Sequence, residues 1–162
     1  MDKEMNREVR LKIRSTRFEV EASLFSDNND DLDVYDERDL EPESIEINTV
    51  GVMKAENGRV EVSYDETEAT GMDGSTTALT YMENEKGVVS MIREGTVSTA
   101  LVFESGKRHH CLYNTPYMPF EICVRTLKVD NRLADLGYID LDYVVEIRGA
   151  KAERTKFRME VL

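Results

Sequence analysis

The sequence has no tryptophan and is poor in cysteine, histidine and proline, with two, two and three of these residues among its 162. Two thiols, Cys111 and Cys123, cannot build the disulfide framework of a small secreted domain, so we expect both to be reduced. The adjacent His109 and His110 would point to opposite faces of a strand and could not hold one metal ion together. Gly-x-Ser-x-Gly, phosphate-loop and zinc-type Cys/His motifs are also absent. We therefore expect no metal, no cofactor and no catalytic residues.

Long apolar runs are missing as well. Ala100–Phe103 is among the longest, whereas a membrane-spanning helix needs about 20 consecutive apolar residues. The N-terminal segment Met1–Glu8 is rich in charge and lacks the apolar stretch of a secretory signal. We expect no membrane segment and a cytoplasmic location.

Basic residues are the minority charge, because 21 Lys and Arg stand against 33 Asp and Glu and the net charge is -12. Nucleic-acid binding rests largely on neutralising phosphates with Lys and Arg, so we expect no nucleic-acid partner. Nine carboxylates and the single base Arg38 lie between Asp27 and Glu43. This stretch begins like a calcium-binding EF-hand loop, but Leu32 replaces the required Gly and Arg38 replaces the bidentate Glu. We interpret residues 26–44 as a solvated acidic loop inserted into a single domain of residues 1–162.

What the sequence does contain is a period of two. From Tyr138 to Arg148, apolar side chains alternate with polar ones and only Val144 breaks the polar side, as in a half-buried antiparallel strand. The first and last segments, Val9–Arg14 and Arg154–Val161, alternate in the same way. About ten such runs follow one another, and Asn57-Gly58 between two of them is the strongest hairpin signal because both residues tolerate positive φ.

This pattern predicts an all-β fold. We expect a single antiparallel, mostly up-and-down β-barrel of about eight to ten strands, with a two-layer sandwich as the other way to bury one side of each strand. The basic first and last strands should lie side by side where the barrel closes, and their basic rows should attract the acidic loop. A helical period never persists for three turns, so we expect at most one short helix, at Asp130–Leu136.

A set of short motifs points to a family. Taken in order, the chain resembles the YwiB-like family of uncharacterised bacterial proteins at Tyr64–Glu68, Thr70–Gly74, Met91–Gly95, Leu101–Glu104, Tyr113–Tyr117 and Phe120–Ile122. The resemblance extends from about Val9 to Val161 and implies a calycin-like, lipocalin-type β-barrel. It implies no activity, because the family is a domain of unknown function. The chain departs from the family pattern at Met118, where a Gly is usual, and in the length of its acidic stretch.

Hairpin geometry assigns Arg93 to the barrel interior. A turn at Gly95–Val97 would pair Met91 with Leu101, and Arg93 lies on the same apolar face as Met91. An ion pair that loses one partner inside a protein costs about 3–5 kcal/mol. We therefore expect Arg93 to have a carboxylate partner.

Two glutamates are candidates for that partner. The alternation that begins at Val60 places Glu66 and Glu68 on the interior face if the strand continues. We expect Glu66 to be the first choice and Glu68 the second. As strand neighbours they would lie about 6.5–7 Å apart, near the spacing of glycosidase carboxylates, but such pairs are also common on sheet rims.

A second hairpin adds two polar side chains to the interior. A turn at Pro116–Pro119 would pair Tyr113 with Ile122 and His109 with Thr126. Both Tyr113 and His109 would then face inward.

These assignments give one predicted ligand-binding group: Arg93, Glu66, Glu68, Tyr113 and His109. Our preferred hypothesis is that they anchor a small, partly apolar and acidic molecule in or at the mouth of the barrel. The structural alternative is that Arg93 and Glu66 form a satisfied pair that closes one end of the barrel. The alternative function is a packed barrel that acts as a protein-interaction module, and an enzyme is a distant third. The oligomeric state stays open, and a homodimer is compatible with the sequence.

Overall fold

The computed structural model describes residues 4–20, 42–70, 73–95, 98–114, 116–147 and 152–162. Ten strands make up nearly all of this part of the chain: β1 Met5–Val20, β2 Glu43–Glu56, β3 Arg59–Asp65, β4 Thr76–Met82, β5 Glu85–Glu94, β6 Ser98–Glu104, β7 Arg108–Asn114, β8 Pro119–Arg132, β9 Tyr138–Ile147 and β10 Ala152–Val161. The one helical segment among the described residues is a single 3₁₀ turn, η2, at Glu68–Thr70.

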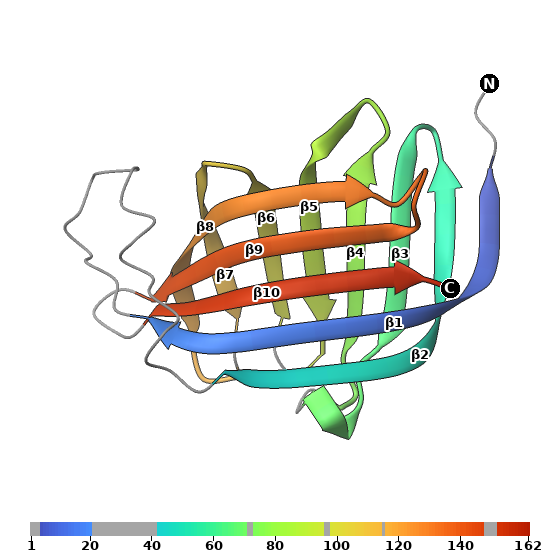
Figure 1. Ribbon diagram of the computed structural model, residues 1–162. Helices are drawn as coiled ribbons and strands as arrows, with labels where there is room; N and C mark the ends of the chain where they lie inside the picture. Colours follow the sequence, from blue (N-terminus) through green and yellow to red (C-terminus); the bar gives the residue numbers. More distant parts are fainter. Residues whose placement is uncertain (1–3, 21–41, 71–72, 96–97, 115, 148–151) are drawn as a thin grey trace.

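The strands form one closed antiparallel barrel in which each strand pairs with its neighbours in sequence. β1 and β10 close the barrel, with a register that runs from Leu11 opposite Val161 to Val20 opposite Ala152. In the view of Figure 1, β8, β9, β10 and β1 cross in front of β3 to β7. The all-β, up-and-down barrel and its closure between the first and last strands are therefore confirmed.

Side chains fill the middle of the barrel. The alternation predicted for β1, β9 and β10 directs one apolar row from each strand inward. Large, fully buried side chains come from eight strands: Leu11, Val62, Leu79, Met91, Phe103, Val124, Ile139, Leu141 and Met159. The rings of Phe103 and Tyr143 lie 4.5 Å apart, centroid to centroid. In the part of the chain that the structure describes, this packing leaves the ends and the outer faces of the barrel as places where a ligand could bind.

Two glycine positions have a clear steric reason. Asn57 and Gly58 adopt φ values of 52° and 77° in the turn between β2 and β3, which confirms the predicted hairpin. Gly51 lies in the middle of β2, where β1 and β3 approach from both sides. A Cβ atom at this position would overlap the Ser63 carbonyl oxygen and the Leu11 side chain.

Val144, which interrupts the polar side of β9, belongs to a second apolar cluster. It is fully buried on the outer face of the barrel with Phe18 of β1 and Ala152 of β10, and Leu127 of β8 packs against them. Arg154 covers this cluster with its guanidinium 5.5 Å from the centre of the Phe18 ring. Val144 therefore interrupts the polar side of β9 because it is buried in a second apolar cluster, outside the main core.

Two predictions for β8 are wrong. The segment Asp130–Leu136 is not a helix, because β8 continues to Arg132 and a single turn follows it, closed by the N–H groups of Leu136 and Gly137 on the Arg132 carbonyl. In the β7–β8 hairpin, His109 lies opposite Val124 and Tyr113 opposite Phe120, two residues from the predicted register. Because a shift of two preserves the face of a strand, the inward orientation of β7 is retained.

The predicted acidic loop at residues 26–44 lies almost entirely outside the described residues, and β2 already includes Glu43 and Ser44. Its predicted attraction to the basic rows therefore stays a prediction. In the described part of the chain, basic side chains of β1 and β10 contact carboxylates of neighbouring strands. Examples are Arg14 with Glu46 and Arg158 with Asp140, each at 3.0 Å.

Candidate functional site

A row of polar side chains crosses five neighbouring strands on the inner face of the barrel. Successive pairs in the strand register connect Tyr64 of β3, Thr77 of β4, Arg93 of β5, Thr99 of β6 and Tyr113 of β7. We call these five residues the polar row. It lies near the end of the barrel where η2 connects β3 to β4 (Figure 1). The register therefore brings together two residues of the predicted site, Arg93 and Tyr113.

Glu66, just beyond the end of β3, joins the polar row through hydrogen bonds. The Thr77 hydroxyl donates to Glu66 Oε1 over 2.7 Å and accepts from Arg93 Nε over 3.1 Å. Arg93 Nη2 lies 3.5 Å from Glu66 Oε1. Glu66 and Thr77 are buried, and Arg93 keeps 16% of its side-chain area accessible. The predicted partnership of Arg93 with Glu66 is confirmed, with a threonine between them.

Two tyrosines beside this pair are held in the neutral form. Burial raises the pKa of the Tyr64 phenol far above its usual range, and the charge of the nearby Glu66 carboxylate adds to the shift. Burial also raises the pKa of Tyr143, against the opposing charge of Arg93. The charged pair thus has two uncharged phenols beside it.

Two buried oxygens of the site have no hydrogen-bond partner among the described residues: Glu66 Oε2 and Thr99 Oγ1. Leaving a buried polar atom unsatisfied costs about 1–3 kcal/mol. Such atoms are rare in native proteins and call for an explanation. A bound molecule that supplies the missing partner is one such explanation for Thr99.

An open pocket of about 540 Å³ lies against this end of β5, β6 and β7. Its wall includes Arg93 and Thr99, the apolar side chains Ile92, Ala100 and Leu112, and the polar groups of Glu94, Ser98 and Asn114. Nε and Nη2 of Arg93 contact Thr77, Glu66 and the Met91 sulfur, and Nη1 has no contact in the described part of the chain. Most of this wall comes from outward-facing positions of the three strands, and Arg93 and Thr99 line it from inward-facing positions at the barrel end. The unsatisfied Thr99 hydroxyl lies buried behind the wall.

Glu68 does not join this site, so its predicted inward position is wrong. The alternation of β3 ends at Asp65, the Glu66 N–H bonds the Ser75 carbonyl over 2.8 Å, and Glu68 begins η2. Its side chain is exposed to solvent. The predicted carboxylate pair of Glu66 and Glu68 is therefore one buried and one exposed group.

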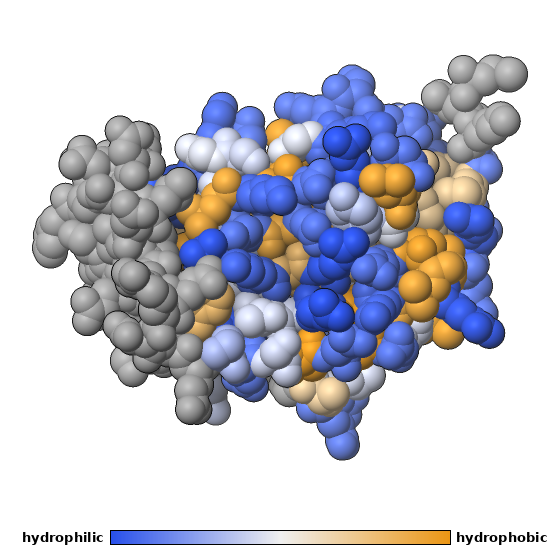
Figure 2. Space-filling view, viewed as in Figure 1, coloured by the Kyte–Doolittle hydropathy of each residue, from blue (hydrophilic) through white to orange (hydrophobic). Residues whose placement is uncertain are grey.

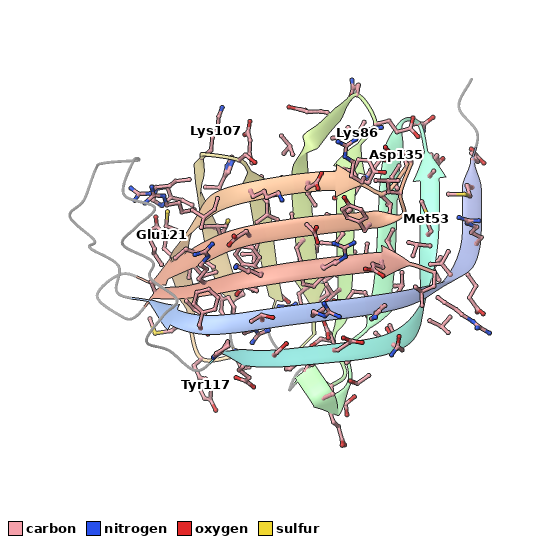
Figure 3. The ribbon with its side chains drawn as sticks, viewed as in Figure 1. Met53, Lys86, Lys107, Tyr117, Glu121 and Asp135 are labelled. Atoms are coloured by element: carbon pink, nitrogen blue, oxygen red, sulfur yellow. The ribbon has the colours of Figure 1, made fainter. Side chains whose placement is uncertain are left out.

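His109 lies at the other end of β7. Figure 3 labels Lys107 before β7 and Tyr117 after it, at opposite ends of the barrel wall. His109 is near the Lys107 end, four residues from Tyr113, which corresponds to about 13–14 Å along a strand. Its Nε2 lies 3.5 Å from Glu104 Oε1 without a hydrogen bond. The structure thus separates His109 from Arg93 and Tyr113.

Three residues of the site were not among the predicted ligand-binding residues: Tyr64, Thr77 and Thr99. A signal for the threonines is present in the sequence. Thr77 precedes Leu79 and Tyr81, and Thr99 precedes Leu101 and Phe103, at the two-residue spacing of an inward row. A threonine at an inward position of a β-strand is compatible with plain packing, so its role follows only from the position of Arg93.

The cysteines and histidines form no candidate metal centre in the parts of the chain that the structure covers, since no three His, Cys, Asp or Glu side chains there could share a metal ion. Cys111 is buried in the core, and Cys123 lies on the opposite face, where burial and then Glu146 raise the pKa of its thiol. Within those same parts, no helix has both the length and the apolar character needed to cross a membrane.

Comparison with known proteins places this chain in a family. Residues 31–159, most of the chain, match the family described as a domain of unknown function, DUF1934. The chain belongs to the DUF1934 family. Its barrel is similar to the crystal structure of the ywiB protein from Bacillus subtilis, with a TM-score of 0.65, 17% sequence identity, and coverage of 96% of this chain and 93% of that one. Comparison with curated proteins finds no match.

These comparisons confirm the resemblance to the YwiB-like family and the barrel fold. At 17% identity the likeness to the ywiB protein shows the fold alone. A function for this DUF1934 domain has to be argued from its own side chains, because one fold can carry many functions.

Proposed function

We propose that this DUF1934 barrel binds a small, partly apolar molecule with a single carboxylate, in the open pocket beside the polar row. One observation carries the proposal: Arg93, fixed by Thr77 and Glu66, and Thr99 both line a pocket of about 540 Å³, and the Thr99 hydroxyl, buried at the edge of that pocket, lacks a described partner. This volume is within the range of about 300–1,000 Å³ that is usual for small-molecule sites.

The charges of the pocket favour a monoanion. Glu66 already neutralises much of the Arg93 charge at 3.5 Å, and Glu94 also lines the pocket. A carboxylate could accept one hydrogen bond from Arg93 Nη1 and one from the Thr99 hydroxyl, which are both donors without a described partner. A phosphate dianion would meet repulsion from the two glutamates.

The apolar part of the ligand would lie along β6 and β7. Ile92, Ala100 and Leu112 line the pocket, and Leu112 is 54% exposed. Covering such an apolar side chain is favourable by about 25 cal/mol per Å² of area removed from water. Because core side chains fill the middle of the barrel, we place the ligand at the barrel end and its outer edge.

Octanoate is a suitable first probe, with octanol as the neutral control of equal length. In a ¹H–¹⁵N NMR titration, octanoate should shift amides of residues 92–95, 98–100 and 112–114, and octanol should bind at least tenfold more weakly. Thr99→Val should weaken octanoate binding about threefold to tenfold, the value of one hydrogen bond. Native mass spectrometry of the purified protein would test for a molecule that is already bound.

The variants separate binding from folding. Thr99→Val removes a hydroxyl that makes no hydrogen bond with a described residue, so the variant should unfold at the same denaturant concentration as the wild type or a higher one. Thr76→Val on the exposed side of β4 is the matched control and should leave octanoate binding unchanged. Equal binding of octanol, or unchanged binding in Thr99→Val, would refute the proposal.

A further inference from the structure

A second groove lies on the outer face of the barrel, across β1, β10, β9 and β8, with a volume of about 370 Å³. Four basic side chains line it: Arg14, Lys128, Lys156 and Arg158. The rest of the lining consists of the carboxylates of Asp140 and Asp142, Thr16, and the strand positions of Leu141 and Phe157. We call this the cationic groove. Figure 2 shows this face of the molecule, which is covered mainly by hydrophilic side chains. The groove shares no residue with the pocket beside Arg93.

The strand register places like charges next to each other in this groove. Arg14 of β1 lies directly opposite Arg158 of β10, and Lys156 is two residues along β10 from Arg158. Like charges at directly opposite positions of neighbouring strands are destabilising. In a chain with a net charge of -12, this local concentration of cations is an exception that a bound anion would relieve.

Carboxylates around the groove orient the two arginines. Glu46 accepts from Nε and Nη2 of Arg14 at 3.2 and 3.0 Å. Arg158 donates from Nε to Glu160 over 2.6 Å and from Nη1 to Asp140 over 3.0 Å, and its guanidinium stacks 4.1 Å above the Tyr138 ring centre. The remaining Nη nitrogen of each guanidinium, Nη1 of Arg14 and Nη2 of Arg158, is used by none of these bonds. The carboxylates therefore fix both arginines and leave one Nη donor of each unused.

The remaining groups complete a positive site. Asp142 is bound by Arg154 through two hydrogen bonds of 2.9 and 2.7 Å. Lys128 lies opposite Asp142 in the strand register and its charge acts on Asp140, but no carboxylate of the described residues is recorded in an ion pair with it. Four basic and two acidic side chains give the lining of the groove a charge of +2. A dianion would neutralise it.

We propose that the cationic groove binds the dianionic phosphate group of a small molecule. Arg14 and Arg158 would each contribute an Nη donor, and Lys128 would contribute its ammonium group. Arg is well suited to phosphate because its planar donors match the phosphate oxygens, and Lys adds a point charge. Free phosphate and a phosphate ester share this chemistry, since both present the same three oxygens.

Isothermal titration calorimetry and ¹H–¹⁵N NMR at low ionic strength test this proposal with inorganic phosphate, glycerol 3-phosphate and succinate. We expect 1:1 binding of phosphate, with amide shifts on β1, β8, β9 and β10 and none near Arg93. Tighter binding of glycerol 3-phosphate than of phosphate would assign the site to esters, and equal binding would assign it to the free ion. Succinate binding as tightly as phosphate would overturn the phosphate assignment.

Lys128→Gln is the decisive variant, because Lys128 forms no described ion pair and its loss should not disturb the fold. It should weaken phosphate binding at least fivefold, and Arg158→Gln should weaken it at least tenfold. Lys54→Gln, an exposed outer-face residue of β2 outside the groove, is the charge-matched control. An equal loss in Lys54→Gln, or binding that does not saturate, would overturn the site in favour of non-specific attraction.

Discussion

Arg93 and Glu66 approach to 3.5 Å at the η2 end of the barrel, and the Thr77 hydroxyl lies between them as a hydrogen-bond relay. The three side chains come from β5, from the chain just after β3, and from β4. Because Thr77 accepts from one partner and donates to the other, it fixes both charged groups at once. This relay holds Arg93 at the edge of the pocket.

Thr77→Val should therefore destabilise the barrel by about 1–3 kcal/mol, because Glu66 and Arg93 each lose a hydrogen bond in a buried setting. Urea unfolding followed by circular dichroism would measure the change. Thr76→Val, which removes an exposed hydrogen bond to Asp65, is the control and should cost less than about 0.5 kcal/mol. Equal effects of the two substitutions would show that the relay contributes nothing special.

The Arg93–Glu66 pair should behave as a coupled buried pair. Arg93→Met leaves the Glu66 carboxylate buried without its cation, so we expect a loss of about 3–5 kcal/mol. The double variant Arg93→Met with Glu66→Leu should recover a large part of that loss, since both charges are then absent. A double-mutant cycle from urea unfolding measures the coupling. Additive single and double losses would mean that the two groups are independently solvated.

The contact between Arg93 and Glu66 can be predicted from the sequence. The turn at Gly95–Val97 sets the register in which Met91 pairs with Leu101, and the structure has this pairing. A period of two then fixes the face of Arg93, and the cost of an unpaired buried charge selects a carboxylate. Local periodicity and one turn are sufficient because the faces of a strand alternate strictly.

Glu68 and His109 show where such reasoning fails. Alternation predicts a face only as long as the strand lasts, and nothing in the sequence after Asp65 signals that η2 begins at Glu68. Face alone also says nothing about position along the barrel axis, so His109 shares a face with Tyr113 and lies at the opposite end. The relay by Thr77 depends on the register of three strands, which one sequence does not specify.

The burial of Tyr64 should make the free energy of unfolding depend on pH in the alkaline range. The pKa of its phenol is raised in the folded state above the ordinary value of 10.0, chiefly by burial. Above pH 10 the unfolded chain releases a proton that the folded chain retains, so the free energy of unfolding falls as pH rises. We expect Tyr64→Phe to flatten this decline by up to about 1.4 kcal/mol per pH unit.

Urea unfolding at pH 8, 9.5 and 10.5 would provide this measurement. Tyr117→Phe is the control, because the Tyr117 side chain is 95% exposed, and its slope should match that of the wild type. An unchanged slope in Tyr64→Phe would show that the phenol ionises as readily in the folded protein as in the unfolded chain.

A side chain at position 51 should lower the stability of the barrel through steric overlap. Gly51→Ala would place a methyl group against the Ser63 carbonyl oxygen and the Leu11 side chain, and backbone on the β3 side cannot move aside cheaply. We expect a loss of about 1–3 kcal/mol, typical of overpacking. Gly87→Ala in β5 is the matched control, since nothing lies within 4 Å of the added Cβ and the substitution should be neutral or slightly stabilising. Thermal unfolding would compare them, and equal melting temperatures would argue against close packing around Gly51.

The wall of the barrel should be weakest between β6 and β7. Among the described residues these strands pair at two positions, Ser98 with Asn114 and Thr99 with Tyr113, whereas β5 and β6 pair from Val88–Glu104 to Arg93–Thr99. Near the turn, the Glu104 N–H instead bonds the Thr126 hydroxyl of β8 at 3.3 Å. Amides of residues 100–103 that point toward β7 should therefore exchange with solvent deuterium faster than those that point toward β5. Uniform protection along β6 would show that β6 and β7 are fully paired in solution. A ligand beside Leu112 that bridges the two strands should slow the exchange.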